Sequence, residues 1–260
     1  MRRGLRLALA CTLYAAAVGA RADELAVYRA SGASLGLFDQ YDNDGYSLGV
    51  SPGPDGSLEL RVQVSGGPLE SRAPFPTGAP RDPALPVSPE RDAYALGLVG
   101  DAGAQALAVE RILAGIASSV RYDNDRGRKQ DPASVFAWRR AHCVGLAELA
   151  VDLLRRVGIS ARTVQGVLRA KSGTDGYDSR IGGLYHRWIE IYYADRGFVF
   201  SDPSSSINGV DARYIPFGSR ALERPRGLTL TELETSGRLN YPLLRLPDAT
   251  LRVRPVGGSR

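Results

Sequence analysis

Three side chains of this 260-residue chain have the types needed for nucleophilic catalysis: Cys143, His186 and Asp202. A cysteine thiolate can attack the carbonyl carbon of an amide or an ester. An imidazole can take the proton of the thiol and hold it in an ion pair, and a carboxylate can fix the tautomer and orientation of that imidazole. These residue types indicate an acyl-enzyme reaction. The backbone N–H of Cys143 and one further donor, which the sequence does not identify, would bind the oxyanion.

Cys143 opens a segment with the periodicity of an amphipathic helix. The apolar stripe of this helix consists of Leu146, Leu149, Ala150, Leu153, Leu154 and Val157. Its polar side consists of Glu148, Asp152, Arg155 and Arg156. Gly158 fits a C-terminal cap. The first turn of a helix offers free N–H groups and the positive end of the macrodipole, which favour a thiolate over a thiol. The alternative interpretation is a buried cysteine that serves only as a small hydrophobe.

His186 lies in a predicted strand. After a strand predicted over 160–168, His186, Trp188, Glu190 and Tyr192 alternate with Arg187, Ile189, Ile191 and Tyr193. A second strand over 198–201 ends at Asp202-Pro203, and we expect the two strands to form a hairpin.

The register of this hairpin decides whether Asp202 reaches His186, because a one-residue slip reverses the face of every side chain. A two-residue turn at Asp195-Arg196 would set Asp202 opposite Ile189, on the wrong face. A three-residue connection, Tyr193-Ala194-Asp195, would set it opposite His186, and a bulge near Gly197 could do the same. We predict the second register because the chemistry requires it.

The stretch AHCVGLAELAVDLLRRVGISAR, followed by HRWIEIYY and FVFSDPS, resembles the core of the bacterial transglutaminase-like superfamily, relatives of the papain-type cysteine peptidases. The family pattern is a Cys that opens a helix ending in Gly-Ile-x-Ala-Arg, then His-x-Trp-x-Glu, then Asp-Pro-Ser/Thr. All three motifs occur in this order between about 131 and 205. The resemblance implies an α+β papain-like fold, with the nucleophile helix packed on an antiparallel sheet. It also implies a catalytic triad of Cys143, His186 and Asp202.

The sequence around the nucleophile leaves the reaction type open. Animal crosslinking enzymes of this superfamily carry Gly-Gln-Cys-Trp, where this chain has Ala141-His142-Cys143-Val144. The resemblance is therefore compatible with a peptidase, an amidase or an acyltransferase. Trp138, Tyr185 and Trp188 are candidates for lining the substrate cleft, with core packing as the alternative for the tryptophans.

We expect no metal and no cofactor. His142 together with the three triad residues would offer acceptable zinc ligands, but adjacent residues rarely bind one ion together, and no His-x-x-x-His or Cys-x-x-Cys spacing is present. We expect His142 to face solvent or a neighbouring loop. The YDNDG stretch at 41–45 lacks the spacing of a calcium loop and predicts a hairpin turn.

Residues 1–22 have the pattern of a signal peptide: arginines, an apolar run, and a small-x-small cleavage site at Ala20-Arg21-Ala22. The apolar run falls short of the roughly 20 residues needed to cross a bilayer. One alternative is therefore a transmembrane anchor, for which the run is too short, and the other is a lipoprotein whose modified cysteine would be Cys11. We therefore expect a secreted or periplasmic protein without stable membrane insertion after cleavage.

Cleavage would change both the charge and the cysteine content. The segment carries four arginines and no acidic residue, so its removal lowers the formal net charge from +5 to +1. Without a basic stripe in the rest of the chain, we expect no nucleic-acid partner. Cys143 would then be the only cysteine, which excludes an intramolecular disulfide.

The remaining chain divides into three parts. Residues 23–67 predict a small β module, because SLELRVQVS alternates at period two and turn signals occur at 43–45 and 54–56. The proline-rich stretch 68–92 predicts a linker or a strap over a surface. Residues 93–260 form the expected catalytic domain, with a helix over 101–120 whose apolar face holds Leu107, Ile112, Ile116 and Val120. The tail from 206 is expected to add strands to its core.

Two functions from different classes follow. The first is a secreted thiol enzyme that acts on amide bonds of protein or peptide substrates, including those of the cell envelope. The second is a non-catalytic envelope protein that keeps the scaffold for binding. The presence of all three triad residue types favours the enzyme.

Overall fold

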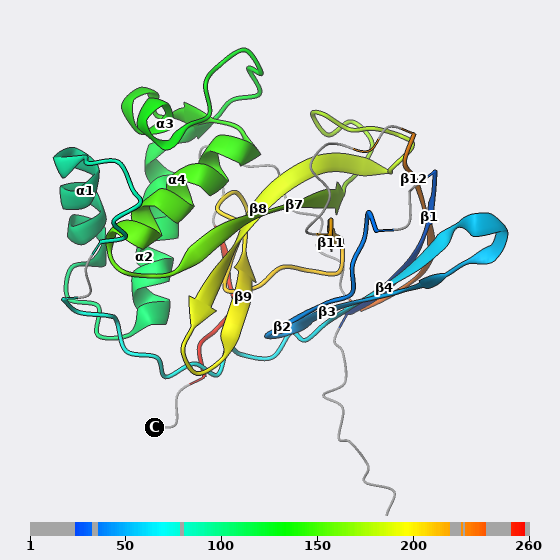
Figure 1. Ribbon diagram of the computed structural model, residues 1–260, viewed down its shortest axis with the longest axis horizontal. Helices are drawn as coiled ribbons and strands as arrows, with labels where there is room; N and C mark the ends of the chain where they lie inside the picture. Colours follow the sequence, from blue (N-terminus) through cyan, green and yellow to red (C-terminus); the bar gives the residue numbers. More distant parts are fainter. Residues whose placement is uncertain are drawn as a thin grey trace, which may run out of the picture.

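The computed structural model describes residues 24–32, 36–78, 81–218, 225, 227–237 and 251–257. The expected signal peptide, residues 1–22, lies outside the described residues. The described part has three layers: helices, a central sheet and a second sheet (Figure 1). The α+β class expected from the sequence is confirmed.

The second sheet contains five strands in the order β12-β1-β4-β3-β2. Its strands are β1 (Glu24–Ser31), β2 (Tyr41–Asn43), β3 (Tyr46–Pro52), β4 (Leu58–Val64) and β12 (Thr229–Ser236). The alternation predicted for β4 is confirmed, because Leu58, Leu60, Val62 and Val64 are buried. Both predicted turns are present. Gly45 adopts a φ of 79° between β2 and β3, and Gly56 a φ of 70° in the short 3-10 helix η1 (Pro54–Gly56).

The C-terminal tail meets the expectation in part, because its strand β11 (Tyr214–Pro216) joins the central sheet, whereas its longest described strand lies elsewhere. Its strand β12 pairs antiparallel with β1, from Leu25 opposite Ser236 to Ser31 opposite Thr229, so it extends the N-terminal sheet and not the central one. Since β4 occupies the other edge of β1, β12 covers an edge that would otherwise expose unpaired backbone groups. A shorter strand of the tail, β13 (Arg252–Val253), pairs in parallel with β10 (Ser206–Ile207).

The central sheet has the order β11-β7-β8-β9. It consists of β7 (Ala161–Arg169), β8 (Gly183–Tyr193), β9 (Gly197–Ser201) and β11 (Tyr214–Pro216), paired antiparallel. Side chains alternate between its two faces. One face meets the helices and the other meets the five-stranded sheet, as the layers of Figure 1 show.

The helical layer contains α1 (Pro89–Val99), α2 (Gln105–Ser119), α3 (Pro132–Trp138) and α4 (Cys143–Arg156). Ile112 and Ile116 of α2 are buried as predicted, but Leu107 is 38% exposed. Leu107 and Ile112 are five positions apart, which is a rotation of about 140° at 3.6 residues per turn, so their side chains point to different sides of the helix. Within the described ranges, no helix is both long and apolar enough to cross a membrane.

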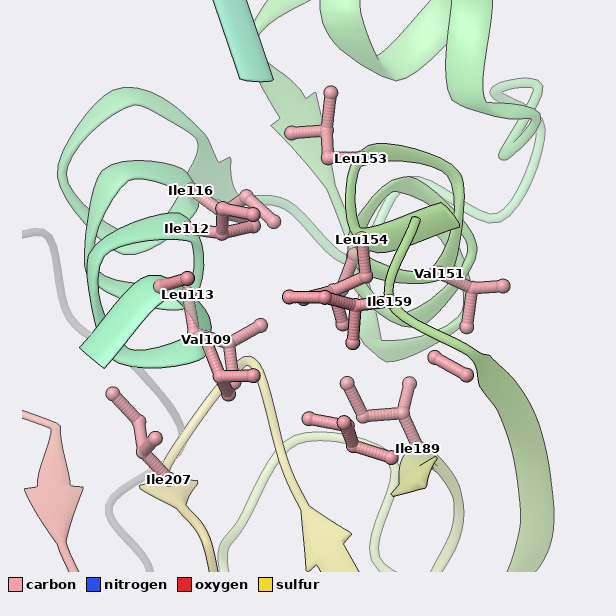
Figure 2. Close-up of a cluster of buried hydrophobic side chains, with 14 of the residues drawn as sticks. Val109, Ile112, Leu113, Ile116, Val151, Leu153, Leu154, Ile159, Ile189 and Ile207 are labelled. Atoms are coloured by element: carbon pink, nitrogen blue, oxygen red, sulfur yellow. The ribbon is translucent and has the colours of Figure 1, made fainter. Parts of the chain in front are cut away.

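The nucleophile helix α4 follows its predicted apolar stripe, all of which is buried. Figure 2 shows Leu153 and Leu154 of α4, with Val109, Ile112, Leu113 and Ile116 of α2, beside Ile189 of the central sheet. Gly158 ends the helix with a φ of 79°, as expected for a C-terminal cap. Two residues predicted for the polar side, Asp152 and Arg156, are instead buried in an ion pair of 2.7 Å.

A second core joins the two sheets. The fully buried side chains Trp188 and Phe200 of the central sheet lie in one cluster with Tyr28 and Leu60 of the five-stranded sheet. Glu190 adds a polar link, because it accepts hydrogen bonds from Asn43 Nδ2 at 3.2 Å and from Arg162 Nε at 2.7 Å. The five-stranded sheet therefore covers one face of the sheet that carries His186.

The proline-rich stretch lies along the surface of the other elements. Leu69 is buried and exchanges backbone hydrogen bonds with Pro255 and Gly257, and the Phe75 N–H donates to the Gly103 carbonyl. Its last residues already belong to α1, which begins at Pro89 with Ser88 as its N-cap. These contacts fit the strap form of the expectation.

Candidate active site

Cys143 is the first residue of α4. Its side chain is buried, with 8% of the residue exposed. The preceding residue, His142, is the N-cap, and its Nδ1 accepts the N–H of Val144 at 3.3 Å. The thiol therefore lies at a helix N-terminus, where the local field favours the thiolate.

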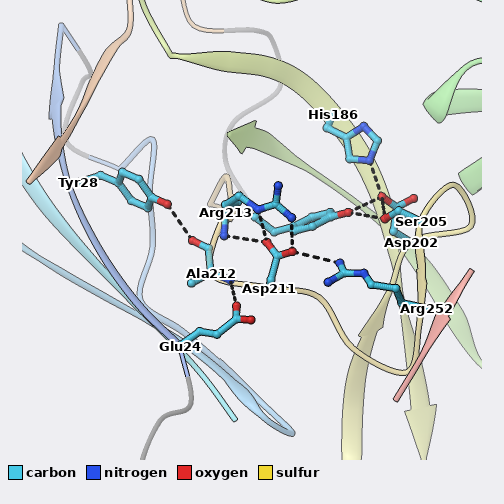
Figure 3. Close-up of polar contacts among 10 residues, drawn as sticks. Glu24, Tyr28, His186, Asp202, Ser205, Asp211, Ala212, Arg213 and Arg252 are labelled. Carbon is cyan, nitrogen blue, oxygen red and sulfur yellow. Dashed lines mark hydrogen bonds and ion pairs between the residues drawn. The ribbon is translucent and has the colours of Figure 1, made fainter. Parts of the chain in front are cut away.

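His186 lies in β8 and is 4% exposed. Its Nε2 lies 2.7 Å from Oδ2 of Asp202, and Figure 3 shows this side of the ring pointing at the carboxylate. The plane of the ring stacks on Trp188, with centroids 6.2 Å apart, and meets the edge of Tyr214 at 5.9 Å. Carboxylate and aromatic neighbours together hold the imidazole in one orientation.

Asp202 follows β9 and begins a tight turn, in which its N–H donates to the Ser206 carbonyl at 2.7 Å. Oδ1 accepts the N–H and the hydroxyl of Ser204 at 2.8 and 2.6 Å. Oδ2 accepts the hydroxyls of Ser205 at 3.1 Å and of Tyr214 at 2.7 Å, besides facing the imidazole. A carboxylate surrounded only by donors is held ionised and in a fixed position.

The hairpin register differs from the prediction. Tyr193 pairs with Gly197, Ile191 with Val199 and Ile189 with Ser201, so the connection is 194–196. If this register continued by one more pair, Asp202 would lie opposite Trp188 and not opposite His186. Because Trp188 and His186 are two residues apart, they share a face, and Asp202 reaches the ring diagonally. The predicted partner of Asp202 was therefore wrong by two residues, which is one period of a strand, whereas the predicted face of the sheet is correct.

The charges of this site stabilise each other. Burial alone would raise the pKa of Cys143. The positive charge of His186, contacts with the side chains of His142 and His186 and the backbone N–H of Arg187 outweigh burial and hold this pKa well below its usual value. Burial would likewise lower the pKa of His186, but the charges of Asp202 and Cys143 raise it. Both directions favour a thiolate–imidazolium pair over a neutral thiol and imidazole.

The carboxylate completes this arrangement. Burial alone would raise the pKa of Asp202, yet the charge and hydrogen bond of His186 and the donors of Ser204 lower it. His186 Nδ1, the ring atom turned away from Asp202, is buried and has no hydrogen-bond partner among the described residues. This atom is available to exchange a proton with the thiol or with a leaving group.

His142 was expected to face solvent or a loop, and its position is different. It caps α4, lines the same pocket as Cys143 and helps to lower the pKa of the thiol. The cap geometry requires this placement, because the side chain at the N-cap folds back over the first turn. Across the described parts of the chain, no group of three His, Cys, Asp or Glu residues is arranged to hold a metal ion.

A pocket of about 260 Å³ opens beside the thiol. Its wall is mainly polar and includes Tyr122, Asn124, Arg126, His142, Asp175 and Tyr185. Tyr122, Asn124, Arg126 and Asp175 were not predicted from the sequence as wall residues, and Tyr122 lies nearest in the chain to a regular element. It belongs to a two-residue strand, β5 (Arg121–Tyr122), which is too short to show periodicity.

The three predicted cleft residues have three different surroundings. Tyr185 lines the pocket, and its hydroxyl donates to the Pro225 carbonyl at 3.0 Å. Trp138, at the end of α3, is 47% exposed and does not line the pocket. Trp188 is fully buried between the two sheets, where it packs on His186, Phe200 and Tyr214. It therefore supports the imidazole from within the core and has no access to substrate.

Tyr214 was also missed by the sequence reasoning. It comes from β11, and its hydroxyl lies 2.7 Å from both Asp202 Oδ2 and Ser205 Oγ. The pairing of β11 with β7, with Tyr214 opposite Leu168, brings it beneath Asp202. No local pattern in the sequence indicates this contact.

The family follows from a comparison of the sequence with family models. Residues 92–203 match the model described as the transglutaminase-like superfamily. This part of the chain is a transglutaminase-like domain. The matched residues run from α1 to the turn after β9, and Cys143, His186 and Asp202 all lie within them. The transglutaminase-like core expected from the three sequence motifs is confirmed.

Solved structures with similar folds include a candidate cysteine protease from Cytophaga hutchinsonii, with 11% identity, a TM-score of 0.45, and 87% of this chain and 95% of that chain covered. The periplasmic domain of TgpA from Pseudomonas aeruginosa has 16% identity and a TM-score of 0.38 over 71% of this chain and 88% of its own. Red sea bream transglutaminase has 11% identity and a TM-score of 0.32, over 74% of this chain and 47% of its own. No curated protein sequence matches this chain.

Proposed function

We propose that this transglutaminase-like protein is an exported thiol enzyme that acts on amide bonds of proteins or peptides, with Cys143 as nucleophile, His186 as its acid–base partner and Asp202 as the residue that orients the imidazole. The contact of 2.7 Å between His186 Nε2 and Asp202 Oδ2 is the observation that carries the proposal. Nδ1, the other ring nitrogen, has no hydrogen-bond partner among the described residues. Because the ring and the thiol lie close enough to shift each other's pKa, the three groups can act in sequence.

The chemistry proceeds through an acyl-enzyme. The thiolate of Cys143 attacks the carbonyl carbon, a C–S bond forms, and the carbonyl π electrons move to the oxygen. The tetrahedral intermediate then expels the amine, which receives the proton held by the His186 imidazolium. Water or a second amine, deprotonated by the neutral imidazole, resolves the thioester and returns the free enzyme. Asp202 stays ionised throughout and keeps the ring aligned.

Both hydrolysis and transfer to an amine fit this sequence of steps. The polar wall of the pocket beside the thiol supports a substrate with polar groups, such as an amide. Export is proposed from the pattern of residues 1–22, and substrates of the cell envelope fit that location. We further propose 93–260 as the catalytic part of the chain, because every residue given a catalytic role falls within it.

The test is intact-mass analysis of the full chain after exposure to glutamine-containing peptides, with and without a primary amine. A mass increase on Cys143, absent in Cys143→Ala, identifies the acyl-enzyme. Peptide products gain the amine if the protein is a transferase and gain water if it is a hydrolase. If the wild-type protein forms no adduct with these peptides or with an activated ester, the enzyme proposal is overturned in favour of a binding protein that keeps the scaffold.

A further inference from the structure

The backbone around Tyr122 is tied directly to the segment that leads into Cys143. Strand β5 pairs in parallel with β6 (Arg140–Ala141), with Tyr122 opposite Ala141. The N–H of Arg121 donates to the Arg139 carbonyl at 2.8 Å, and the N–H of Asp123 donates to the Ala141 carbonyl at 2.9 Å. These bonds flank Tyr122 on both sides, so its position relative to the nucleophile is fixed by the backbone.

The side chain of Tyr122 reaches the pocket at the start of α4. It lines the same wall as Cys143, and its hydroxyl lies within hydrogen-bonding reach of the Cys143 backbone N–H. The neighbouring N–H groups are committed elsewhere. That of His142 donates to Gln130 Oε1 at 3.1 Å, and that of Val144 donates to the His142 ring at 3.3 Å. In the resting protein the Cys143 N–H faces the Tyr122 phenol oxygen, so both groups can turn a hydrogen toward a carbonyl oxygen that enters between them beside the thiol.

Other polar side chains of the pocket are engaged in different contacts. The amide of Asn124 donates to Asp175 Oδ2 at 2.6 Å, and the hydroxyl of Tyr185 donates to the Pro225 carbonyl at 3.0 Å. Tyr122 is the side chain of this wall that the Cys143 N–H itself faces, which places its hydroxyl to complement that N–H. Resting on the proposed function, we propose that Tyr122 is the second donor of the oxyanion hole, where its hydroxyl and the Cys143 N–H together bind the oxygen of the acyl carbonyl.

This role follows the electrons of the reaction. When the C–S bond forms, the carbonyl oxygen gains a negative charge, and two donors fixed before the reaction stabilise that charge without reorganising. When the intermediate collapses, the electron pair returns from oxygen to carbon and the C–N bond breaks. Tyr122 keeps its own proton in both steps, so the proton count of the reaction is unchanged.

A donor in this position must stay protonated at working pH. Burial and the nearby negative charge of Cys143 raise the pKa of Tyr122 above its ordinary value, although the Cys143 N–H acts in the opposite direction. The phenol is therefore neutral whenever the thiolate is present. A phenylalanine at this position would keep the ring and remove only the donor.

The experiment compares Tyr122→Phe with the wild type in three assays on the full chain: turnover of p-nitrophenyl acetate or a peptide substrate, affinity for a peptide aldehyde, and alkylation by iodoacetamide. An aldehyde forms a hemithioacetal whose oxygen occupies the oxyanion position. Alkylation occurs at a saturated carbon and needs no oxyanion hole. We expect kcat to fall about 10²–10³-fold and aldehyde affinity to fall in parallel, while the alkylation rate is unchanged.

Tyr94→Phe is the matched control. Its hydroxyl contacts Ser119 Oγ at 3.0 Å, away from the pocket, so all three assays should remain at wild-type values. Turnover and aldehyde affinity of Tyr122→Phe at the wild-type level would overturn the oxyanion role alone. A parallel loss of alkylation would also overturn it, because Tyr122 would then act by holding the nucleophile. A wild-type protein that never forms an acyl-enzyme would instead overturn the proposed function.

Discussion

Tyr214 Oη lies 2.7 Å from Oδ2 of Asp202, the same carboxylate oxygen that faces the His186 ring. A strand on the far side of the central sheet thereby holds the acid of the proposed triad. Asp202 has no solvent contact to replace this donor, because it is 1% exposed. The orientation of the imidazole therefore depends on tertiary contacts beneath it as much as on the hairpin that carries it.

Tyr214→Phe should lower both stability and activity. The substitution removes a hydrogen bond to a buried charge, a loss of about 1.5–3 kcal/mol in the free energy of unfolding. Denaturant unfolding measures this loss, and turnover at fixed pH measures the effect on the imidazole. Tyr94→Phe, whose hydroxyl bonds only to neutral groups, serves as the comparison. An unfolding midpoint equal to that of the wild type would show that the Tyr214 contact contributes no stability.

The reactivity of Cys143 toward iodoacetamide should extend well below the pH of an ordinary thiol. The charge of His186 lowers the pKa of Cys143, so the thiolate is lost only as pH falls through that lowered value. In His186→Ala the thiol should return toward its unperturbed pKa of about 8.5, which reduces the thiolate fraction at pH 6.5 about a hundredfold. The rate of alkylation measured against pH for both proteins checks this prediction. Coincident curves would show that His186 does not form an ion pair with Cys143.

Asp202→Asn should leave weak activity, less impaired than in Cys143→Ala. An amide no longer carries the charge that raises the pKa of His186, so the imidazolium is lost at lower pH and the alkaline limb of the pH–rate profile moves down. A loss in kcat of about 10²–10⁴-fold is expected from the disturbed tautomer and orientation. The full pH–rate profile is the measurement. An alkaline limb at the same pH as in the wild type would contradict the prediction that the charge of Asp202 raises the pKa of His186.

The same variant should change acid unfolding. Because the native pKa of Asp202 is lowered, its ionised form contributes stability above the ordinary carboxyl pKa, and this contribution is lost as pH falls through the native value. Asp202→Asn should therefore be less stable at neutral pH, with the difference from the wild type narrowing in strong acid. Urea unfolding across acidic pH values measures it. If the difference in unfolding free energy between the two proteins did not narrow in acid, another carboxyl group would be responsible for the loss of stability at low pH.

Asp152→Ala should destabilise the helical layer without touching the pocket. Asp152 lies 3.0 Å from Arg91 Nε and 2.7 Å from Arg156 Nε, and all three residues are buried. Removing the carboxylate takes away the acidic partner of the buried Arg91 and leaves Arg156 with Asp92 as its remaining acidic partner, at about 3–5 kcal/mol. Thermal or denaturant unfolding checks the loss. Asp101→Ala, which breaks an exposed ion pair with Arg111, should show no measurable change.

Local patterns predicted much of this protein correctly. The period of the apolar residues from Leu146 to Val157 identified α4, and its buried stripe followed directly from 3.6 residues per turn. Alternation placed His186 and Trp188 on one face of β8, and the order of three motifs indicated the transglutaminase-like core. These features depend on nearest neighbours along the chain, so the residues themselves carry the information.

Long-range placement could not be read in the same way. Loop geometry and neighbours distant in sequence decide three features of the fold: the pairing of β8 with β9, the position of β12 at the edge of β1, and the burial of Asp152 against Arg91. For the same reason, the supports of the site were missed: Tyr214 beneath Asp202, His142 as the helix cap and Tyr122 beside the thiol. The sequence by itself determined which residue types are available for catalysis and which faces they occupy. Only the packing of three layers decided which of them meet, because contact between distant segments is set by the whole core and not by local periodicity.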